Sequence, residues 1–249
     1  MNEAKFDHKG SVYAKARPGY PDAIFEYLCS SDAVGANKTV ADFGSGTGIF
    51  SMQISDFAGT VYAIEPNDDM RRNAEIEFVN YPSITSVNAT AENSLLANSS
   101  VDLITVAQAF HWFDRSAFKT ECHRILKPNG KVFLLWNDRD ISSDIISENF
   151  IINKKYCPNF KGSSNGIDFS KEGFSDFFDG EFDMVEFLNG LVYTKQMFIE
   201  RNLSSSYAPL KYDSKYHDYI SELEALFDKY QTDGNVLYPY ITRCYLGKV

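Results

Sequence analysis

The sequence predicts an α/β fold of the doubly wound type, in which helices cover both faces of a mostly parallel sheet. The first half of the chain alternates short apolar runs with segments of helical periodicity. A glycine-rich loop follows the first of these runs, and an acidic residue closes the next run. In doubly wound sheets such a unit lies at the carboxyl ends of the strands, where ligands bind.

Five short runs have the composition of strands that are buried on both faces of a sheet. Each is apolar and rich in β-branched or aromatic residues, as parallel strands are. Helical segments separate them, and this alternation indicates a doubly wound sheet with a ligand crevice at the carboxyl ends of its strands. The predicted strands are Thr39 to Phe43, Thr60 to Glu65, Ile84 to Asn88, Val101 to Val106 and Lys131 to Trp136.

Three helices are predicted between these strands. The first follows Gly48, and the second follows Pro66 and carries apolar residues on one face. The third runs from Asp114 to Leu126, with the aspartate in the N-cap position. Pro128 and the Asn-Gly pair after it end this helix and turn the chain into the next strand.

The pattern changes after residue 136, where helical segments dominate. The longest of them, Ser214 to Gln231, has an apolar stripe that is more typical of a core-packing face than of a cofactor site. We interpret residues 1–137 as an N-terminal segment and α/β core, residues 138–231 as a mostly helical insert that includes the sixth strand and covers the active site, and residues 232–249 as a final strand that returns to the core sheet. The other predicted segments are helices at 143–156, 171–178 and 195–202, a polar loop at 161–166, and strands at 182–193 and 235–248.

The glycine loop has a mechanical explanation. A strand that turns sharply into a helix, with its backbone close to a ligand, has no room for a Cβ on the turn. Gly44, Gly46 and Gly48 alternate at this point. A dinucleotide fingerprint would place Gly or Ala three residues after Gly46, where this chain has Ile49. The spacing therefore disfavours a dinucleotide site, and a glycine turn without any ligand is the alternative.

Two acidic residues specify the kind of cofactor. Asp42 stands directly before the loop, where its charge would repel a pyrophosphate but would suit a cationic amine. Glu65 closes the next strand, and its two carboxylate oxygens suit the two hydroxyls of a ribose. Together they predict S-adenosylmethionine rather than NAD as the cofactor.

Composition limits the partners that we expect. The 249 residues include 24 Lys and Arg against 34 Asp and Glu, for a net charge of −10, and no basic run tracks a phosphate backbone, so a nucleic-acid substrate is disfavoured. No apolar stretch approaches the ~20 residues that span a bilayer, and the N-terminus lacks the apolar core of a signal peptide. The four cysteines show no CxxC spacing. We expect a cytoplasmic protein with no membrane partner and no metal site.

Seven stretches of the chain carry a family resemblance. The most specific are the YxxxRPxYP pattern from Tyr13 to Pro21 and the segment QAFHWFD from Gln108 to Asp114. The chain resembles class I S-adenosylmethionine-dependent methyltransferases, and more narrowly the small-molecule group that includes trans-aconitate methyltransferase-like proteins. The resemblance implies a Rossmann-like sheet of seven strands, the last one antiparallel. The other stretches are Asp42 to Gly48, Glu65 to Asn67, Thr90 to Glu92, Trp136 to Asn137 with Arg139, and Ser204 to Tyr207.

The resemblance also implies which residues hold the cofactor. Asp42 and the loop backbone would face its methionine end, and Gln108 would lie beside the same moiety. Met70 would lie against the adenine and Ala91 would offer it a backbone N–H. Many relatives have Asp where this chain has Thr90, so a hydroxyl or a neighbouring carboxylate would take over the adenine amino contact. The predicted set is Arg17, Asp42, Gly44, Ser45, Gly46, Glu65, Pro66, Met70, Thr90, Ala91, Glu92 and Gln108.

The acceptor side is less specific. His111 and Tyr13 are the predicted catalytic residues, since either would deprotonate a phenol or an amine, whereas a carboxylate acceptor needs no base. A histidine satisfied by nearby backbone is the alternative for His111. Arg139 and Arg201 suit a carboxylate clamp, although each alone is more typical of a solvated surface arginine. The predicted substrate-binding residues are Tyr20, Trp136, Arg139 and Tyr207.

These observations predict methyl transfer from S-adenosylmethionine to a small-molecule acceptor, through a carboxylate or hydroxyl oxygen. Two alternatives remain open at this point. One is a module that binds the cofactor as a sensor or partner without turnover. The other is an RNA or protein methyltransferase on the same core. The sequence names neither the acceptor nor the oligomeric state.

Overall fold

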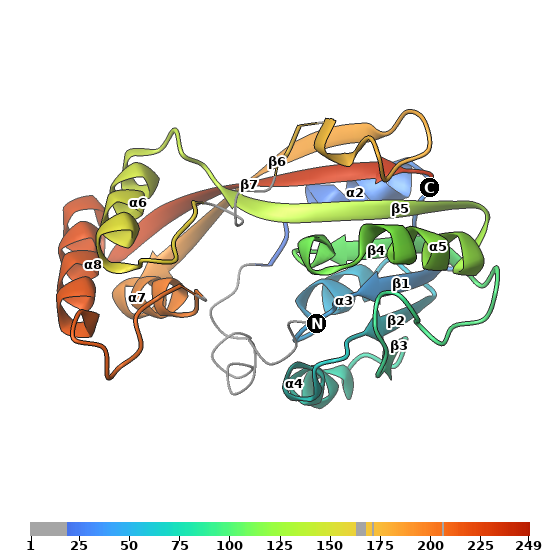
Figure 1. The fold of residues 1–249 in the computed structure, drawn as a ribbon, viewed down its shortest axis with the longest axis horizontal. Helices are drawn as coiled ribbons and strands as arrows, with labels where there is room; N and C mark the ends of the chain where they lie inside the picture. Colours follow the sequence, from blue (N-terminus) through green and yellow to red (C-terminus); the bar gives the residue numbers. More distant parts are fainter. Residues whose placement is uncertain (1–18, 163–167, 171, 206) are drawn as a thin grey trace.

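The computed structural model describes residues 19–162, 168–170, 172–205 and 207–249 (Figure 1). Tyr13 and Arg17, which the sequence predicts near the cofactor, lie outside the described residues. In the described part of the chain, no helix combines the length and the apolar character that crossing a membrane requires.

A single mixed sheet of seven strands organises the chain, in the order β3-β2-β1-β4-β5-β7-β6. The pairs β1–β2, β2–β3, β1–β4 and β4–β5 are parallel, and β7 runs antiparallel to both β5 and β6. The predicted doubly wound sheet with an antiparallel last strand is therefore confirmed. The strands are β1 Thr39–Phe43, β2 Thr60–Ile64, β3 Ile84–Val87, β4 Val101–Ala107, β5 Leu126–Arg139, β6 Asp183–Thr194 and β7 Asn235–Gly247.

The helices follow local capping signals where the sequence predicted them. The Asp114 side chain accepts hydrogen bonds from two N–H groups in the first turn of α5, which confirms it as the N-cap. Asn67 caps α4 in the same way through the N–H of Met70. The helices are α2 Ala23–Ser30, α3 Ile49–Ser55, α4 Asp68–Phe78, α5 Arg115–Ile125, α6 Asp144–Tyr156, α7 Lys195–Leu203 and α8 Tyr216–Tyr230, with 3₁₀ turns η2 Phe110–Trp112 and η4 Glu172–Phe174.

Two predictions of element boundaries are wrong. The segment at 171–178 contains only the short turn η4, because its phenylalanines are buried in the main core instead of forming one face of a helix. Strand β5 begins at Leu126, before the predicted turn, and its register with β4 shifts between Val101 and Leu103. A Cβ at Gly130 would lie 2.7 Å from the side chain of Leu126, so this irregular stretch packs tightly.

The three longest strands join two parts of the molecule. In Figure 1, β5, β6 and β7 run from the parallel part of the sheet to the region of α6, α7 and α8. A separate hydrophobic cluster forms there, and it includes the stripe of α8 that the sequence predicted as a core-packing face. Polar residues at the junction of the two parts therefore come close to the carboxyl ends of the parallel strands.

Trp136 is a core residue, and its predicted role in substrate binding is wrong. Its side chain is fully buried on β5 within the main hydrophobic cluster. Its ring centroid lies 5.3 Å from that of Phe174, 6.0 Å from that of Tyr245 and 6.3 Å from that of Phe110. An indole enclosed by three aromatic rings has no face left for a ligand.

Removing this indole should destabilise the fold. We expect Trp136→Ala to lower the free energy of unfolding by about 3–5 kcal/mol, because the cavity would lie in a close-packed core. Urea denaturation measures the change. Trp112→Ala is the matched control, since that indole is 37% exposed, and it should change stability by no more than about 0.5 kcal/mol. Equal losses in the two variants would contradict the core assignment.

Candidate cofactor and acceptor site

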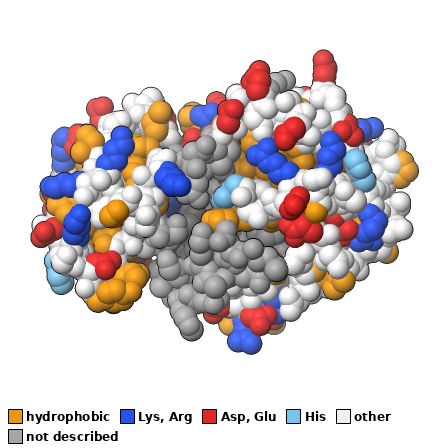
Figure 2. All heavy atoms as spheres, viewed as in Figure 1, with side chains coloured by type: hydrophobic (Ala, Val, Ile, Leu, Met, Phe, Trp, Pro, Cys, Tyr) orange, Lys and Arg blue, Asp and Glu red, His pale blue; other side chains and the backbone are white. Residues whose placement is uncertain are grey.

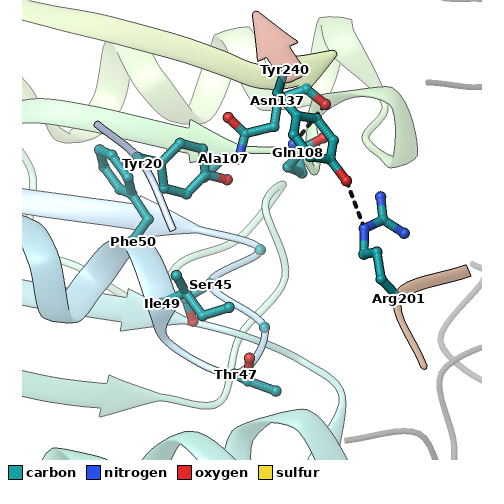
Figure 3. Close-up of a pocket in the computed structure, with 12 residues that line it drawn as sticks. Tyr20, Ser45, Thr47, Ile49, Phe50, Ala107, Gln108, Asn137, Arg201 and Tyr240 are labelled. Carbon is teal, nitrogen blue, oxygen red and sulfur yellow. Dashed lines mark hydrogen bonds between the residues drawn. The ribbon is translucent and has the colours of Figure 1, made fainter. Parts of the chain in front are cut away.

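A pocket opens at the carboxyl ends of β1 and β4, where the strand order reverses. Ligands bind at this topological switch point in open α/β sheets. The described residues that line the pocket come from the glycine loop, from the ends of β4 and β5, and from α7 and β7 (Figure 3). They are Tyr20, Gly44, Ser45, Gly46, Thr47, Ile49, Phe50, Ala107, Gln108, Asn137, Arg201 and Tyr240.

The three loop glycines all have positive φ but serve different purposes. A Cβ at Gly44 would lie 2.5 Å from the Cβ of Ala109, and a Cβ at Gly48 would lie 2.4 Å from the ring of Phe78. These two glycines allow the loop to pack closely against Ala109 and Phe78. A Cβ at Gly46 would meet no atom of the described residues within 4 Å. Its backbone lines the pocket, where a ligand can approach closely.

Glu65 presents a fixed carboxylate beside this loop. Its Oε2 accepts a hydrogen bond from the Gly46 N–H at 2.9 Å, and its Oε1 accepts one from the Asn67 N–H at 2.8 Å. The residue is only 8% exposed. Each carboxylate oxygen has more than one acceptor position. Neighbouring hydroxyls on a ribose are donors from which a carboxylate can accept.

Asp42 lies beneath the pocket and is not part of its wall. Its side chain is fully buried, with Oδ1 accepting from the Thr105 hydroxyl at 2.8 Å and Oδ2 from the Ser51 hydroxyl at 2.5 Å. Burial raises the pKa of Asp42 to about 6, although both hydroxyls oppose the shift. The negative charge of Asp42 can act on a ligand in the pocket across the loop. Both of its carboxylate oxygens, however, already accept hydrogen bonds from side chains of the fold.

Two further polar residues shape the pocket wall. Thr47 is 4% exposed, and its hydroxyl has no hydrogen-bond partner in the described part of the structure. Sequence reasoning selected Ser45 from this loop and missed Thr47, because only the buried orphan hydroxyl marks it as a ligand contact. Gln108 has φ +64°, and its Nε2 donates to the Asn137 carbonyl at 3.4 Å. Left-handed backbone at a non-glycine residue is typical of functional sites.

The residues predicted on the adenine side lie outside this lining. Ala91 is buried. The Glu92 carboxylate accepts a hydrogen bond from the backbone N–H of Asp114 at 3.1 Å, so it holds the start of α5. Their contact with an adenine ring stays a prediction. The same holds for Pro66, Met70 and Thr90.

His111 does not line the pocket. It belongs to η2 and is half-buried, with its ring centroid 4.7 Å from that of Trp112. Its catalytic role therefore stays a prediction, as does that of Tyr13.

Both arginines of the predicted carboxylate clamp are buried. Arg139 is 8% exposed and Arg201 is 7% exposed, so the interpretation of each as a solvated surface residue is wrong. Arg139 donates through Nη2 to the Tyr207 hydroxyl at 2.9 Å, and Arg201 donates through Nε to the Tyr240 hydroxyl at 2.9 Å (Figure 3 shows the second bond). Although burial opposes the shift, the Arg139 charge lowers the pKa of the Tyr207 phenol. Of these four residues, Arg201 and Tyr240 line the pocket, whereas Arg139 and Tyr207 are not in its lining.

An asparagine network joins the pocket to both parts of the molecule. The Asn137 Oδ1 accepts from Asn189 Nδ2 at 3.0 Å and from the Thr242 hydroxyl at 2.6 Å. Both asparagine amides also donate to the carbonyl of Gly19, at 3.2 and 3.0 Å. The chain is thus held at the residue next to Tyr20, which was predicted to bind substrate and lies in the pocket wall.

The pocket lining and the acid beside it fit the predicted cofactor. Two backbone N–H groups fix the Glu65 carboxylate beside the loop, the Thr47 hydroxyl lacks a partner among the described residues, and a Cβ at Gly46 would meet no atom of the described residues within 4 Å. In the described part of the chain, no cluster of three or more His, Cys, Asp or Glu side chains is placed to hold a metal ion.

Comparisons with known proteins agree with this geometry. Residues 41–134 match the family model described as a methyltransferase domain. An uncharacterized methyltransferase of Schizosaccharomyces pombe is 33% identical over 135 residues, which cover 52% of this chain and 51% of that protein. An uncharacterized methyltransferase of Mycobacterium tuberculosis is 33% identical over 129 residues, which cover 52% and 50%. The chain thus spans about half the length of these relatives.

Solved structures show the same fold. A protein of Anaeromyxobacter dehalogenans, provisionally assigned as a type II methyltransferase, superposes with a TM-score of 0.69 at 22% identity, over 93% of this chain and 97% of that one. The YcgJ protein of Bacillus subtilis superposes with a TM-score of 0.57 at 15% identity, over 92% and 100%. Residues 41–134 therefore match a methyltransferase domain, and the chain has the fold of these solved structures.

Proposed function

We propose that this protein transfers the methyl group of S-adenosylmethionine to an oxygen atom of a small-molecule acceptor. The observation that carries the proposal is the Glu65 carboxylate, which two backbone N–H groups hold beside Gly46 of the pocket lining. It follows β2, the neighbour of β1 in the sheet, and lies within the segment that matches the methyltransferase domain.

The chain's own residues divide the binding of the cofactor between them. Glu65 would accept from the ribose hydroxyls, Thr47 would give and receive hydrogen bonds with the polar part, and Gln108 would lie beside the methionine moiety. The bound cofactor supplies a sulfonium methyl group that is already activated for transfer. The protein therefore has to align an acceptor atom behind that methyl and exclude water.

The acceptor side of the pocket supports a small molecule. Arg201 and Tyr240 reach it from α7 and β7, so the C-terminal part of the chain faces the glycine loop across a confined space. On the face drawn in Figure 2, basic and acidic side chains of the described residues are interspersed. A net charge of −10 also opposes binding to a phosphate backbone.

An oxygen that is already ionised suits this pocket best. The described residues of its lining include no histidine, aspartate or glutamate. A neutral hydroxyl or amine would have to lose a proton during transfer, and a base would have to lie within hydrogen-bond reach of it. A carboxylate needs no such group. A carboxylate acceptor is consequently the form of the proposal that the geometry favours.

Replacing the fixed carboxylate should weaken cofactor binding. We expect Glu65→Gln to raise the Kd for S-adenosylhomocysteine by roughly 10- to 100-fold, because hydrogen bonds to a charged acceptor contribute about 1.5–3 kcal/mol each. Titration calorimetry measures the change. Glu148→Gln is the control, since that carboxylate pairs with Lys229 outside the pocket. Unchanged affinity in a folded Glu65→Gln protein would contradict the cofactor site.

The buried Asp42 should make cofactor binding depend on pH. Its pKa of about 6 in the free protein means that it is ionised above pH 7 and largely protonated below pH 5. A cationic ligand nearby favours the ionised form, so binding should release a proton. We expect the affinity for S-adenosylmethionine to be constant above pH 7 and to fall below pH 6, by at most about tenfold per pH unit.

Calorimetry from pH 5 to pH 8 tests this linkage. Asp42→Asn should bind more weakly at pH 7.5 and show a flatter profile, because it carries no titratable group at this position. A wild-type affinity that is the same at pH 5 and pH 8 would show that Asp42 does not sense the cofactor's charge.

A further inference from the structure

Arg201 is a buried cation without an anionic partner among the described residues. Its Nε donates to the Tyr240 hydroxyl at 2.9 Å, and its Nη1 lies 3.5 Å from the Ser205 hydroxyl. Both partners are neutral. No carboxylate of the described residues lies within 4.0 Å of its guanidinium, although the residue is only 7% exposed. A buried charge that is not compensated in this way is costly to the fold.

A second arginine adds positive charge near Arg201. Arg139 is buried nearby, and its positive charge opposes that of Arg201. The ring of Tyr240 packs 5.8 Å from the Arg201 guanidinium carbon, and its hydroxyl fixes the orientation of the group through Nε. Arg201 thus lines the pocket next to the phenol of Tyr240, and the described lining residues include no acid.

A planar anion is the chemistry that fits this wall. The guanidinium presents paired N–H groups in a fixed fork that matches a carboxylate. Phosphate also pairs with a guanidinium but carries more negative charge, so the acids Asp42 and Glu65 next to the glycine loop would repel it more strongly. Arg201 lines a pocket whose opposite side is the glycine loop, beside which the Glu65 carboxylate is held.

We propose that Arg201 is a carboxylate-binding residue of this pocket and that Tyr240 is its positioning residue. The inference rests on the proposed methyl transfer and deepens it. The carboxylate has two possible sources, the amino-acid part of the cofactor or the methyl acceptor, and both present the same chemistry to the guanidinium. A bound carboxylate supplies the negative charge that the described residues do not place beside Arg201.

Titration of two adenosine ligands into the wild type and Arg201→Met separates these sources. S-adenosylhomocysteine carries the carboxylate, and 5′-deoxy-5′-methylthioadenosine keeps the nucleoside and the thioether but lacks it. If the cofactor supplies the carboxylate, Arg201→Met should lose at least tenfold in affinity for S-adenosylhomocysteine and keep its affinity for methylthioadenosine. Arg115→Met is the control, because that exposed arginine pairs with Asp176 outside the pocket lining.

If the acceptor supplies the carboxylate, both adenosine ligands should bind the variant as they bind the wild type. Millimolar citrate or benzoate should then raise the melting temperature of the wild-type S-adenosylhomocysteine complex. Benzamide, which is uncharged, should not, and neither carboxylate should stabilise the Arg201→Met complex. Tyr240→Phe should reduce whichever effect is observed by about threefold to tenfold, the range expected for one lost hydrogen bond, and leave methylthioadenosine binding unchanged.

One pattern would overturn the inference. Arg201→Met would keep wild-type affinity for S-adenosylhomocysteine, and citrate and benzoate would stabilise both complexes equally or not at all. A wild-type protein that binds neither adenosine ligand would instead contradict the proposed function, so the two failures are distinguishable.

Discussion

The hydrogen bonds from Gly46 and Asn67 to the Glu65 carboxylate are the interaction on which the site depends. They join the loop after β1 to the end of β2, and these two strands are paired in parallel within the sheet. The loop takes this shape because its glycines accept left-handed backbone where a Cβ would collide or fill the pocket. The pairing of β1 with β2, the conformation of the glycine loop and the position of the Glu65 carboxylate therefore depend on one another.

The second constraint comes from the long antiparallel strands. Because β5, β6 and β7 extend past the parallel sheet, they place a separate hydrophobic cluster opposite the glycine loop. The chain thus separates two tasks. The parallel half holds Asp42 and Glu65 next to the glycine loop, whereas the antiparallel half contributes Arg201 and Tyr240 to the pocket lining. This charge asymmetry across a single pocket is what favours an anionic acceptor in our account.

The sequence predicted most of the fold and the loop side of the site, because both depend on local signals. An apolar run, a capping residue or a glycine spacing each depends only on residues that are close together in the sequence. Thr47 was not selected as a site residue, and Arg201 was judged more typical of a solvated surface, since burial is a property of the folded chain. The role of Trp136 was wrongly predicted for the same reason. The sequence does not show whether an aromatic residue near the end of a strand contacts a ligand or packs against other aromatic rings.

The central claim is that the acids around the glycine loop select a cationic adenosine cofactor over a dinucleotide. Titration calorimetry of S-adenosylhomocysteine and, separately, of NAD into the purified protein tests it most directly. The account predicts micromolar binding of S-adenosylhomocysteine and no detectable heat of binding with NAD. Binding of NAD with equal or higher affinity would contradict it.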